Sequence, residues 1–567
     1  MTTAISVLGG IGLFLLGMTV MTDGLKELAG SALRTVLGKA AATPLRGFLW
    51  GAVVTLLVQS SSATTMTTIG LVSAGLLSFP EGLSLVLGAN VGTTGTGWLI
   101  ALIGVRVSLT AAALPTIFVG ALTKLLGRGR ISGAGAALAG FGLVLFGLTT
   151  LQQGMGGLAE RLHPADLPAV ITSPGVGWWS GWFGVLALIL LGLVMTALMQ
   201  SSTAAIAVTL SAYFAGAIGL DQACALIIGQ NIGTATSSAL AAIGASNTAK
   251  RLAVAYILFK LIAALIALAL FPVVIPLLMR ASSRIDGVTL LACYHTAFNV
   301  VGVLVLLPVI ERFTRIVERI LPERGSPLTR SLDPAALGTP VAAVEAVRHT
   351  VARALAVLCG SADAALTAAS RDEAGSRGKE AISVPEAADA LRQAQVFVSD
   401  VSGPPESDDE QRRLTSTLHA LDHASRMAET AGESTKFGGV TSGPDDVRAS
   451  ELFVEAMRNT ALVANEVAVP PRPDRSSAAS ESPVISTEEV ICRLERNAKE
   501  LEELRRIHRA ATLNAVGNAG LTASEAMARV EKVQSQTALA HHAWRAAAHL
   551  VGRGERNSQS LLNEGGS

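Results

Sequence analysis

The feature that most constrains this chain is a set of long apolar stretches confined to its first 310 residues. A helix needs roughly 20 apolar residues to cross about 30 Å of hydrocarbon. Backbone polar groups inside a bilayer must be satisfied within the chain, so such stretches predict an all-α, polytopic membrane domain over 1–310. We expect full spans near residues 5–22, 83–104, 108–126, 132–151, 222–243, 250–279 and 288–310.

Two further apolar stretches, 46–78 and 185–219, are too long for one span and are interrupted midway by polar residues. The interruptions read Gln59-Ser60-Ser61-Ser62 and Gln200-Ser201-Ser202-Thr203. Each half is about 13–17 residues long, too short to cross the hydrocarbon comfortably. The pattern therefore predicts two re-entrant helical hairpins, each built from two half-helices.

Charge is unevenly distributed along the chain, although the net charge is only +1. The first 310 residues carry 14 Lys and Arg against 7 Asp and Glu, and the remainder carries 30 against 36. This balance excludes a nucleic-acid binder driven by a basic domain. With the N-terminus outside, most basic residues of the apolar half fall in cytoplasmic loops, which also places the polar C-terminal half in the cytoplasm.

The apolar half contains an internal repeat with one constant offset, which pairs Gln59 with Gln200 and Asn90 with Asn231. Residues 51–94 match residues 192–235 at 16 of 44 positions, and the matches include both Gln-Ser-Ser motifs and both Gly-x-Asn-x-Gly-Thr motifs. We place the repeats at about 5–126 and 132–310. The first contains an odd number of spans, so the second is expected to run inverted. Inverted repeats with matched helix breaks indicate the binding site of a secondary transporter.

The two predicted hairpin tips are neutral but rich in oxygen ligands. No charged residue occurs in 47–80 or in 167–220. A helix break exposes N–H groups that attract an anion, while carbonyls, hydroxyls and amide oxygens suit Na⁺. The alternative is that these hydroxyls only bond their own helix or join neighbouring helices.

Other polar residues inside the apolar half carry the same two interpretations. Asn90 and Asn231 are flanked by glycines, and His295 and Asn299 share one face of the last span. Each is either a ligand-binding group or part of a hydrogen-bonded packing pair. Lys260 either lies in the membrane interior or extends its ammonium to the cytoplasmic surface.

These residues resemble the sodium-dependent phosphate cotransporters of the type II family, in which paired Gln-Ser-Ser motifs each precede Gly-x-Asn-x-Gly-Thr. The resemblance implies symport of inorganic phosphate with Na⁺ across the bacterial inner membrane. Tyr256 and Lys260 depart from the family's His-x-x-Phe-Asn pattern, which leaves the ion stoichiometry open. By resemblance, phosphate and sodium would be bound by Gln59, Ser60, Ser61, Ser62, Thr64, Gln200, Ser201, Ser202 and Thr203, supported by Asn90, Thr93, Asn231, Thr234, His295 and Asn299.

The polar half predicts a bundle of six helices near 340–370, 385–400, 409–434, 449–466, 486–515 and 520–552. Residues 311–339 are expected to form a linker, and 401–408 and 468–484 to be breaks. Residues 340–560 are similar to the PhoU-like regulatory domain. That similarity implies a metal at Asp422 and Glu429, whereas spacing alone also fits an Asp422–Arg426 pair on an exposed face. His541, His542 and His549 are interpreted as surface residues.

The expected function is a Na⁺-coupled phosphate transporter regulated by its cytoplasmic domain. The alternatives are a phosphate receptor that signals through that domain and a carrier of another oxyanion. The sequence shows no nucleophile–base pair and no P-loop that would indicate an enzyme. We expect no cofactor besides Na⁺ as the coupling ion. The expected partners are phosphate, Na⁺ and the lipid bilayer, with a cytoplasmic regulatory partner or a homo-oligomer as further candidates and no nucleic acid.

Overall fold

The computed structural model describes a chain that is helical and, within the described ranges, contains no strand, which confirms the all-α prediction. The described residues are 2–40, 43–104, 109–160, 163–171, 175–243, 246–322, 326–370, 383–401, 407–433, 443–469, 486–517 and 520–553. Most of the predicted breaks at 401–408 and 468–484, and parts of the predicted 340–560 domain, lie outside them.

Six helices of the described chain are long and apolar enough to cross a membrane, so the protein is a multi-pass membrane protein. One of them was not expected as a full span: Trp178–Met199 has 22 residues, whereas we predicted a half-helix that begins at 185. The predicted spans at 108–126 and 222–243 are not among the six, and Ala111–Leu126 is a shorter apolar helix of the described chain. The six are Thr3–Ala29, Phe79–Leu102, Arg130–Ala159, Trp178–Met199, Asn247–Ala281 and Gly287–Ile320.

The chain divides into two compact units. The first contains Met1–Ile69 and Leu77–Glu323, and the second contains Gly70–Leu76 and Arg324–Ser567. The segment Gly70–Leu76 therefore interrupts the first unit, although it lies in the apolar half of the sequence. The predicted linker begins with a helix, α13 (Ile310–Ile320), rather than with irregular chain.

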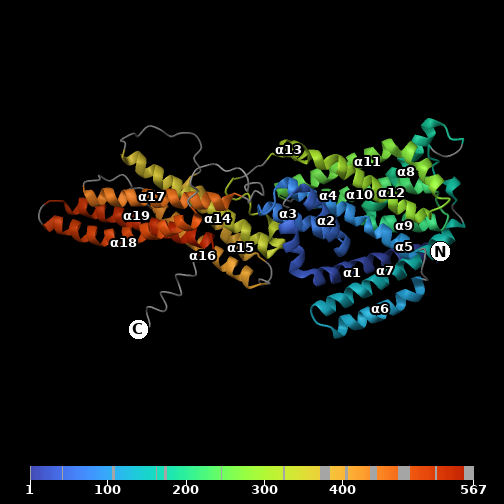
Figure 1. Cartoon of the computed structure of the whole chain (residues 1–567), viewed down its shortest axis with the longest axis horizontal. Coiled ribbons are helices and arrows are strands. Elements are labelled where there is room, and N and C mark those ends of the chain that lie inside the picture. The colour runs from blue at the N-terminus through green and yellow to red at the C-terminus, as the bar shows by residue number, and fades with distance from the viewer. Residues whose placement is uncertain are drawn as a thin grey trace. The chain divides into compact units, whose positions relative to one another are not determined.

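Helices α1 (Thr2–Ala40), α6 (Leu109–Leu126) and α7 (Arg130–Ala159) lie side by side in the first unit (Figure 1). Glycines let the backbones of α1 and α7 approach closely. A Cβ added at Gly17 would lie 2.5 Å from the backbone nitrogen of Val144, and one added at Gly147 would lie 2.4 Å from that of Phe14. Any side chain at these positions would force the two helices apart.

Each predicted hairpin is a pair of helices interrupted at its glutamine. The first pair is α2 (Pro44–Val58) and α3 (Ser61–Ser73), and the second is α8 (Trp178–Met199) and α9 (Ser202–Phe214). The glycines that end α3 and α9, Gly75 and Gly216, have φ of 76° and 80°. The same three backbone hydrogen bonds close both helix ends, shifted by the offset of the sequence repeat.

The remaining helices of the first unit pack on these pairs in matched fashion. They are α4 (Phe79–Thr93), α5 (Gly95–Gly104), α10 (Leu220–Ala241), α11 (Asn247–Ala281) and α12 (Gly287–Leu306). α4 packs on α2, and α10 packs on α8. A Cβ at Gly51 would meet the Leu85 carbonyl at 2.1 Å, and its repeat counterpart Gly192 would meet the Leu226 carbonyl at 2.2 Å. The sequence repeat is thus also a repeat of contacts.

The second unit contains the six predicted helices within a few residues of their expected bounds. They pack around a continuous core of alanine, leucine and valine side chains. Their neighbours include the pairs α14–α17, α16–α19 and α18–α19. The bounds are α14 (Pro340–Ser370), α15 (Val384–Ser399), α16 (Asp408–Glu433), α17 (Pro444–Ala468), α18 (Thr487–Gly517) and α19 (Ala523–Leu550).

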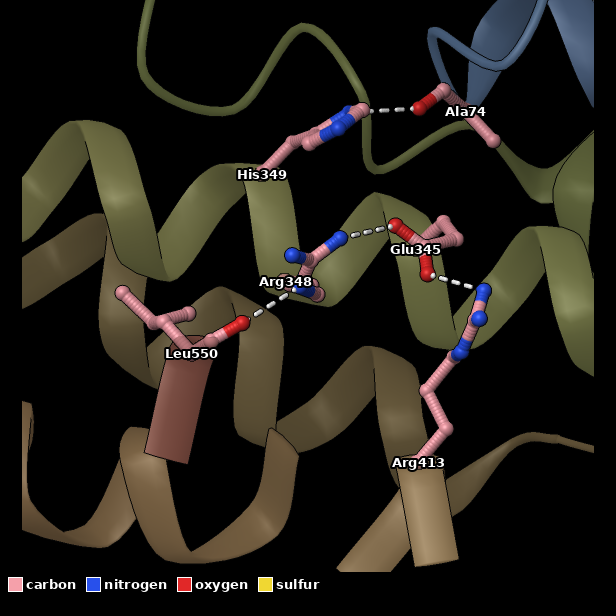
Figure 2. A network of polar contacts seen from close by, with 6 residues as sticks. All are labelled: Ala74, Glu345, Arg348, His349, Arg413 and Leu550. Atoms are coloured by element: carbon pink, nitrogen blue, oxygen red, sulfur yellow. Dashed lines mark hydrogen bonds and ion pairs between the residues drawn. The ribbon is translucent and has the colours of Figure 1, made fainter. Parts of the chain in front are cut away.

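A polar network on α14 joins distant segments of the second unit (Figure 2). The buried Glu345 carboxylate accepts from Arg348 and Arg413, each at 2.9 Å. One turn along, Nδ1 of the buried His349 lies 2.7 Å from the carbonyl oxygen of Ala74. Burial lowers the pKa of His349, so the neutral ring donates its Nδ1–H to that carbonyl.

Candidate functional site

The two hairpin breaks share a backbone conformation that is rare for residues with a side chain. Gln59 has φ of 56° and Gln200 has φ of 50°, and among the described residues no other non-glycine residue has positive φ. The left-handed conformation costs an L-residue roughly 1–2 kcal/mol. Its occurrence at two positions related by the repeat offset therefore needs compensating contacts, and it marks both tips as functional candidates.

Each glutamine side chain is held by the same two contacts. Nε2 of Gln59 donates to the Leu56 carbonyl, and its Oε1 accepts from the Thr96 hydroxyl at 2.8 Å. Gln200 likewise donates to the Ala197 carbonyl, and its Oε1 accepts from the Ser237 hydroxyl at 2.9 Å. Sequence reasoning missed Thr96 and Ser237. The repeat offset pairs them with one another, so the signal was present.

The residues after each glutamine begin the second half-helix. Ser60 Oγ accepts from the backbone N–H of Ala63, and Ser201 Oγ accepts from that of Ala204, each at 3.2 Å. The N-terminal turns of α3 and α9 therefore lie at the two helix breaks. Backbone N–H groups at a helix N-terminus attract anions. The side chains of both turns are accessible: Ser62 is exposed, and Ser61, Ser202 and Thr203 are partly exposed. No hydrogen bond joins the two Gln-Ser-Ser segments within the described chain.

Thr64, Thr93 and Thr234 have local partners. Thr64 is buried and accepts from the Thr55 hydroxyl at 2.9 Å. Thr93 donates to the Ala89 carbonyl at 2.8 Å and Thr234 to the Asn231 carbonyl, each within its own helix. For these two threonines the contacts match the alternative in which a hydroxyl bonds its own helix.

The predicted supporting residues Asn90, Asn231, His295 and Asn299 are buried, and Lys260 contacts two of them. Nδ2 of Asn90 donates to Oδ1 of Asn299 at 2.6 Å, and Nδ2 of Asn299 donates to the His295 carbonyl at 2.8 Å. The Lys260 ammonium donates to both Asn90 and Asn231. Lys260 is 2% exposed, so its side chain does not extend to the surface.

Two buried polar atoms in this cluster have no partner in the described structure, Nδ2 of Asn231 and Nδ1 of His295. Buried polar groups are normally paired, so each is a candidate contact for a bound ligand. With Asn90, Lys260 and Asn299, these residues form a buried polar cluster in the first unit.

The predicted metal residues of the second unit do not form a cluster. Asp422 pairs with Arg426 at 3.1 Å, and Glu429 is exposed. In the described part of the chain, no group of three or more His, Cys, Asp or Glu side chains is arranged to hold a metal ion. A metal at Asp422 and Glu429 stays a prediction.

Histidines gather instead between α16 and α19. Nδ1 of His423 lies 3.1 Å from Nδ1 of His542, and the rings of His419 and His549 stack with centroids 4.9 Å apart. His541 contacts the same group through its ring. His549 is buried, so the interpretation of His541, His542 and His549 as surface residues is wrong for that position. Burial, with His542 and His549 nearby, lowers the pKa of His423 to about 4.

Comparison with known proteins shows which family the chain resembles. Residues 13–153 and 184–284 match the family described as Na⁺/Pi-cotransporter. The chain is 31% identical to the uncharacterized protein YqeW of Bacillus subtilis over 55% of its own length and 96% of that protein. It is 30% identical to the putative inorganic phosphate export protein YjbB of Escherichia coli over 62% of its length and 63% of that protein.

A more distant relative is the sodium-dependent phosphate transport protein 2B of Homo sapiens, which is 35% identical over 17% of this chain and 16% of that protein. No solved structure gives a significant match. The fold and the paired tips define a multi-pass membrane protein with a duplicated broken-helix motif. The chain belongs to the Na⁺/Pi-cotransporter family.

Proposed function

We propose that this protein carries inorganic phosphate across the bacterial inner membrane by symport with Na⁺, with its helical second unit as a regulator. Family membership and the names of its relatives support phosphate as the substrate. The observation that carries the proposal is the matched pair of left-handed glutamines, each followed by a serine-capped helix.

The chemistry of the tips fits an anion bound together with a cation. The first turns of α3 and α9 offer backbone N–H groups and hydroxyls to phosphate oxygens. The last turns of α2 and α8 offer carbonyls, which suit Na⁺. Neither tip carries a fixed charge. A phosphate bound there gains from a cation bound beside it, and this mutual stabilisation couples the two solutes.

The test is uptake of radiolabelled phosphate into proteoliposomes of the purified protein, with an inward Na⁺ gradient against a matched K⁺ gradient. Uptake that requires Na⁺ is expected. Ser61→Ala and Ser202→Ala should each abolish it, while Thr123→Val should not, because that hydroxyl bonds only its own helix on α6. Wild-type uptake by both serine variants would remove the tips from the site.

Two results would favour the other candidate functions. Phosphate binding in detergent without flux under either gradient would favour a receptor. Equal competition by sulfate would favour a general oxyanion carrier. Because one relative is named a putative inorganic phosphate export protein, efflux from phosphate-loaded vesicles should be measured beside uptake.

The regulatory role is supported by the end of the first hairpin. α3 begins in the first unit, but its last residues belong to the second unit together with Arg324–Ser567. The His349–Ala74 contact holds this end within the second unit (Figure 2). A change in the packing of the helical bundle would therefore be transmitted along α3 to the Gln59 tip.

A further inference from the structure

Lys260 places a basic side chain in the interior of the membrane unit. It lies 13 residues after the start of α11, about 20 Å along the helix at 1.5 Å per residue. Its side chain is 2% exposed and among the largest fully buried side chains of the described chain. A charged group at such a depth is costly and is by default a functional candidate.

The contacts of this ammonium are those of a small cation without a carboxylate partner. It donates to Oδ1 of Asn90 and, at 2.6 Å, to Oδ1 of Asn231. It also lies 5.2 Å from the ring centroid of Tyr256, a distance that allows cation–π attraction. Within the described chain no ion pair involves Lys260. The charge is therefore held by neutral oxygens and an aromatic face.

The surrounding hydrogen bonds fix which way the amides point. Lysine can only donate, so Asn90 must present its oxygen to Lys260 and its Nδ2 elsewhere. That Nδ2 donates to Oδ1 of Asn299, whose own Nδ2 donates to the His295 carbonyl. This series of hydrogen bonds ends on a backbone carbonyl, which can only accept. Every hydrogen bond in the series therefore has a defined donor and acceptor. Asn90 and Asn231 both present oxygens to the point that Nζ occupies.

The two asparagines are repeat counterparts, related by the same offset as the two glutamines of the tips. The point between their oxygens is therefore shared by the two repeats. Two amide oxygens directed at one buried point are ligands of the kind that unwound membrane helices offer to Na⁺. In this protein the ammonium of Lys260 occupies that point.

A comparison within the chain indicates what a neutral residue would do there. Tyr256-x-x-Phe259-Lys260 on α11 has the same spacing as His295-x-x-Phe298-Asn299 on the neighbouring α12. Asn299 contributes an amide oxygen to the network, whereas Lys260 contributes a charge. An asparagine at 260 is shorter and would leave the oxygens of Asn90 and Asn231 directed at an unfilled point.

We propose that the Lys260 ammonium is a built-in monovalent cation that takes the place of one coupling Na⁺ between Asn90 and Asn231. The chain would then carry its anion with one Na⁺ fewer than the same protein with a neutral amide at position 260. This inference rests on the proposed function, because it concerns the ion stoichiometry of that transport.

The test compares wild type with Lys260→Asn, Lys260→Arg and Lys260→Met in proteoliposomes. Initial influx of labelled Na⁺ and labelled phosphate is measured in the same vesicles to give the Na⁺-to-phosphate ratio. K260N is expected to raise this ratio by one and to steepen the dependence of uptake on Na⁺. K260R keeps the charge and should keep the wild-type ratio. K260M removes the charge without adding an oxygen, and it should lose most uptake.

The outcomes separate this inference from the proposed function. Sodium-dependent uptake with the same ratio in wild type and K260N would overturn the inference and leave symport intact. Sodium-independent uptake by wild type would overturn the proposed Na⁺ coupling. In that case a gain of Na⁺ dependence in K260N would still support the cation role of Lys260, and continued independence would overturn both.

A binding measurement keeps the inference testable if K260N folds but does not transport. Thermal unfolding in detergent is compared in NaCl and in choline chloride at equal ionic strength. A ligand that binds the folded state raises the Tm, so Na⁺ should stabilise K260N more than it stabilises wild type. An equal or smaller Na⁺ effect in K260N would overturn the inference.

Discussion

The Ser73 hydroxyl donates a 2.6 Å hydrogen bond to the Asp333 carboxylate across 260 residues of sequence. Both residues are buried in the second unit, where Asp333 also accepts from the backbone N–H of Ala335. Ser73 is the last residue of α3, the helix that begins at the first Gln-Ser-Ser tip. One end of a predicted transport hairpin is thus fixed by the unit that we propose to be regulatory.

Ser73→Ala should destabilise the second unit. Removal of the hydroxyl leaves a buried carboxylate with one fewer donor, and a hydrogen bond to a charged group contributes about 1.5–3 kcal/mol. The measurement is thermal unfolding of the purified full chain in detergent. Ser399→Ala is the control, because its hydroxyl bonds only the Val396 carbonyl of its own exposed helix end. Equal Tm values for S73A and S399A would contradict the prediction.

His349→Ala should raise the maximal rate of phosphate uptake. The substitution removes the donor to the Ala74 carbonyl and so frees the end of α3 from the helical bundle. If the second unit limits transport, loss of this contact relieves the limit, while the Na⁺ dependence set at the membrane sites stays unchanged. Proteoliposome kinetics check both quantities. An unchanged maximal rate would count against regulation through this contact.

Thr96→Val and Ser237→Ala should each slow transport without preventing insertion. Each removes the hydroxyl donor to a glutamine held in the left-handed conformation. A net hydrogen bond contributes about 1 kcal/mol, which corresponds to roughly a fivefold change in the population of the ordered tip. The measurement is the initial rate of uptake at saturating Na⁺. Thr116→Val, whose hydroxyl bonds only the Ala112 carbonyl, should keep the wild-type rate.

Features set by local sequence were predictable. The bounds of α14 follow from Pro340 and the apolar periodicity after it, and both hairpin breaks follow from polar residues within apolar stretches. The start of α8 at Trp178 was missed because we predicted that the apolar stretch begins at 185. In the structure the three tryptophans before that point form the first turns of the helix.

Features set by long-range pairing were not predictable from hydropathy. The Lys260 contacts with Asn90 and Asn231 join three helices, and a single apolar stretch does not reveal which face meets a partner. The membership of Gly70–Leu76 in the second unit depends on residues far away in the sequence, such as Asp333. The Thr96–Gln59 hydrogen bond is the exception. Applying the repeat offset to every hydroxyl pairs Thr96 with Ser237, and this pairing could have been found from the sequence.

Gly229→Ala should destabilise the packing of α8 on α10. A Cβ at Gly229 would lie 1.8 Å from the Ile189 carbonyl oxygen, so the helices must move apart. Overpacking of this kind typically costs about 1–3 kcal/mol. Gly9→Ala on α1 is the matched control, because nothing lies within 4 Å of a Cβ there. Thermal unfolding in detergent should give a lower Tm for G229A than for G9A, and the reverse order would refute the assigned packing.

The histidine cluster of the second unit should make its stability depend on pH. Burial lowers the pKa of His423 and of His549 to about 4, with neighbouring histidines adding to the effect. The unfolded chain binds protons near the ordinary histidine pKa of about 6.5, so it takes up more protons than the folded chain between about 4 and 6.5. The free energy of unfolding should therefore be fully present above this range and fall as the pH decreases through it.

The check on this pH dependence is thermal unfolding of the full chain across that range, for wild type and for His423→Gln. The variant cannot take up the extra proton on unfolding, so its Tm should fall less steeply at acidic pH. His163→Gln, at an exposed position outside the cluster, should follow the wild-type curve. Parallel curves for wild type and H423Q would show that the acid sensitivity arises from other groups, because the half-buried imidazole of His423 would then have contributed nothing to the proton difference.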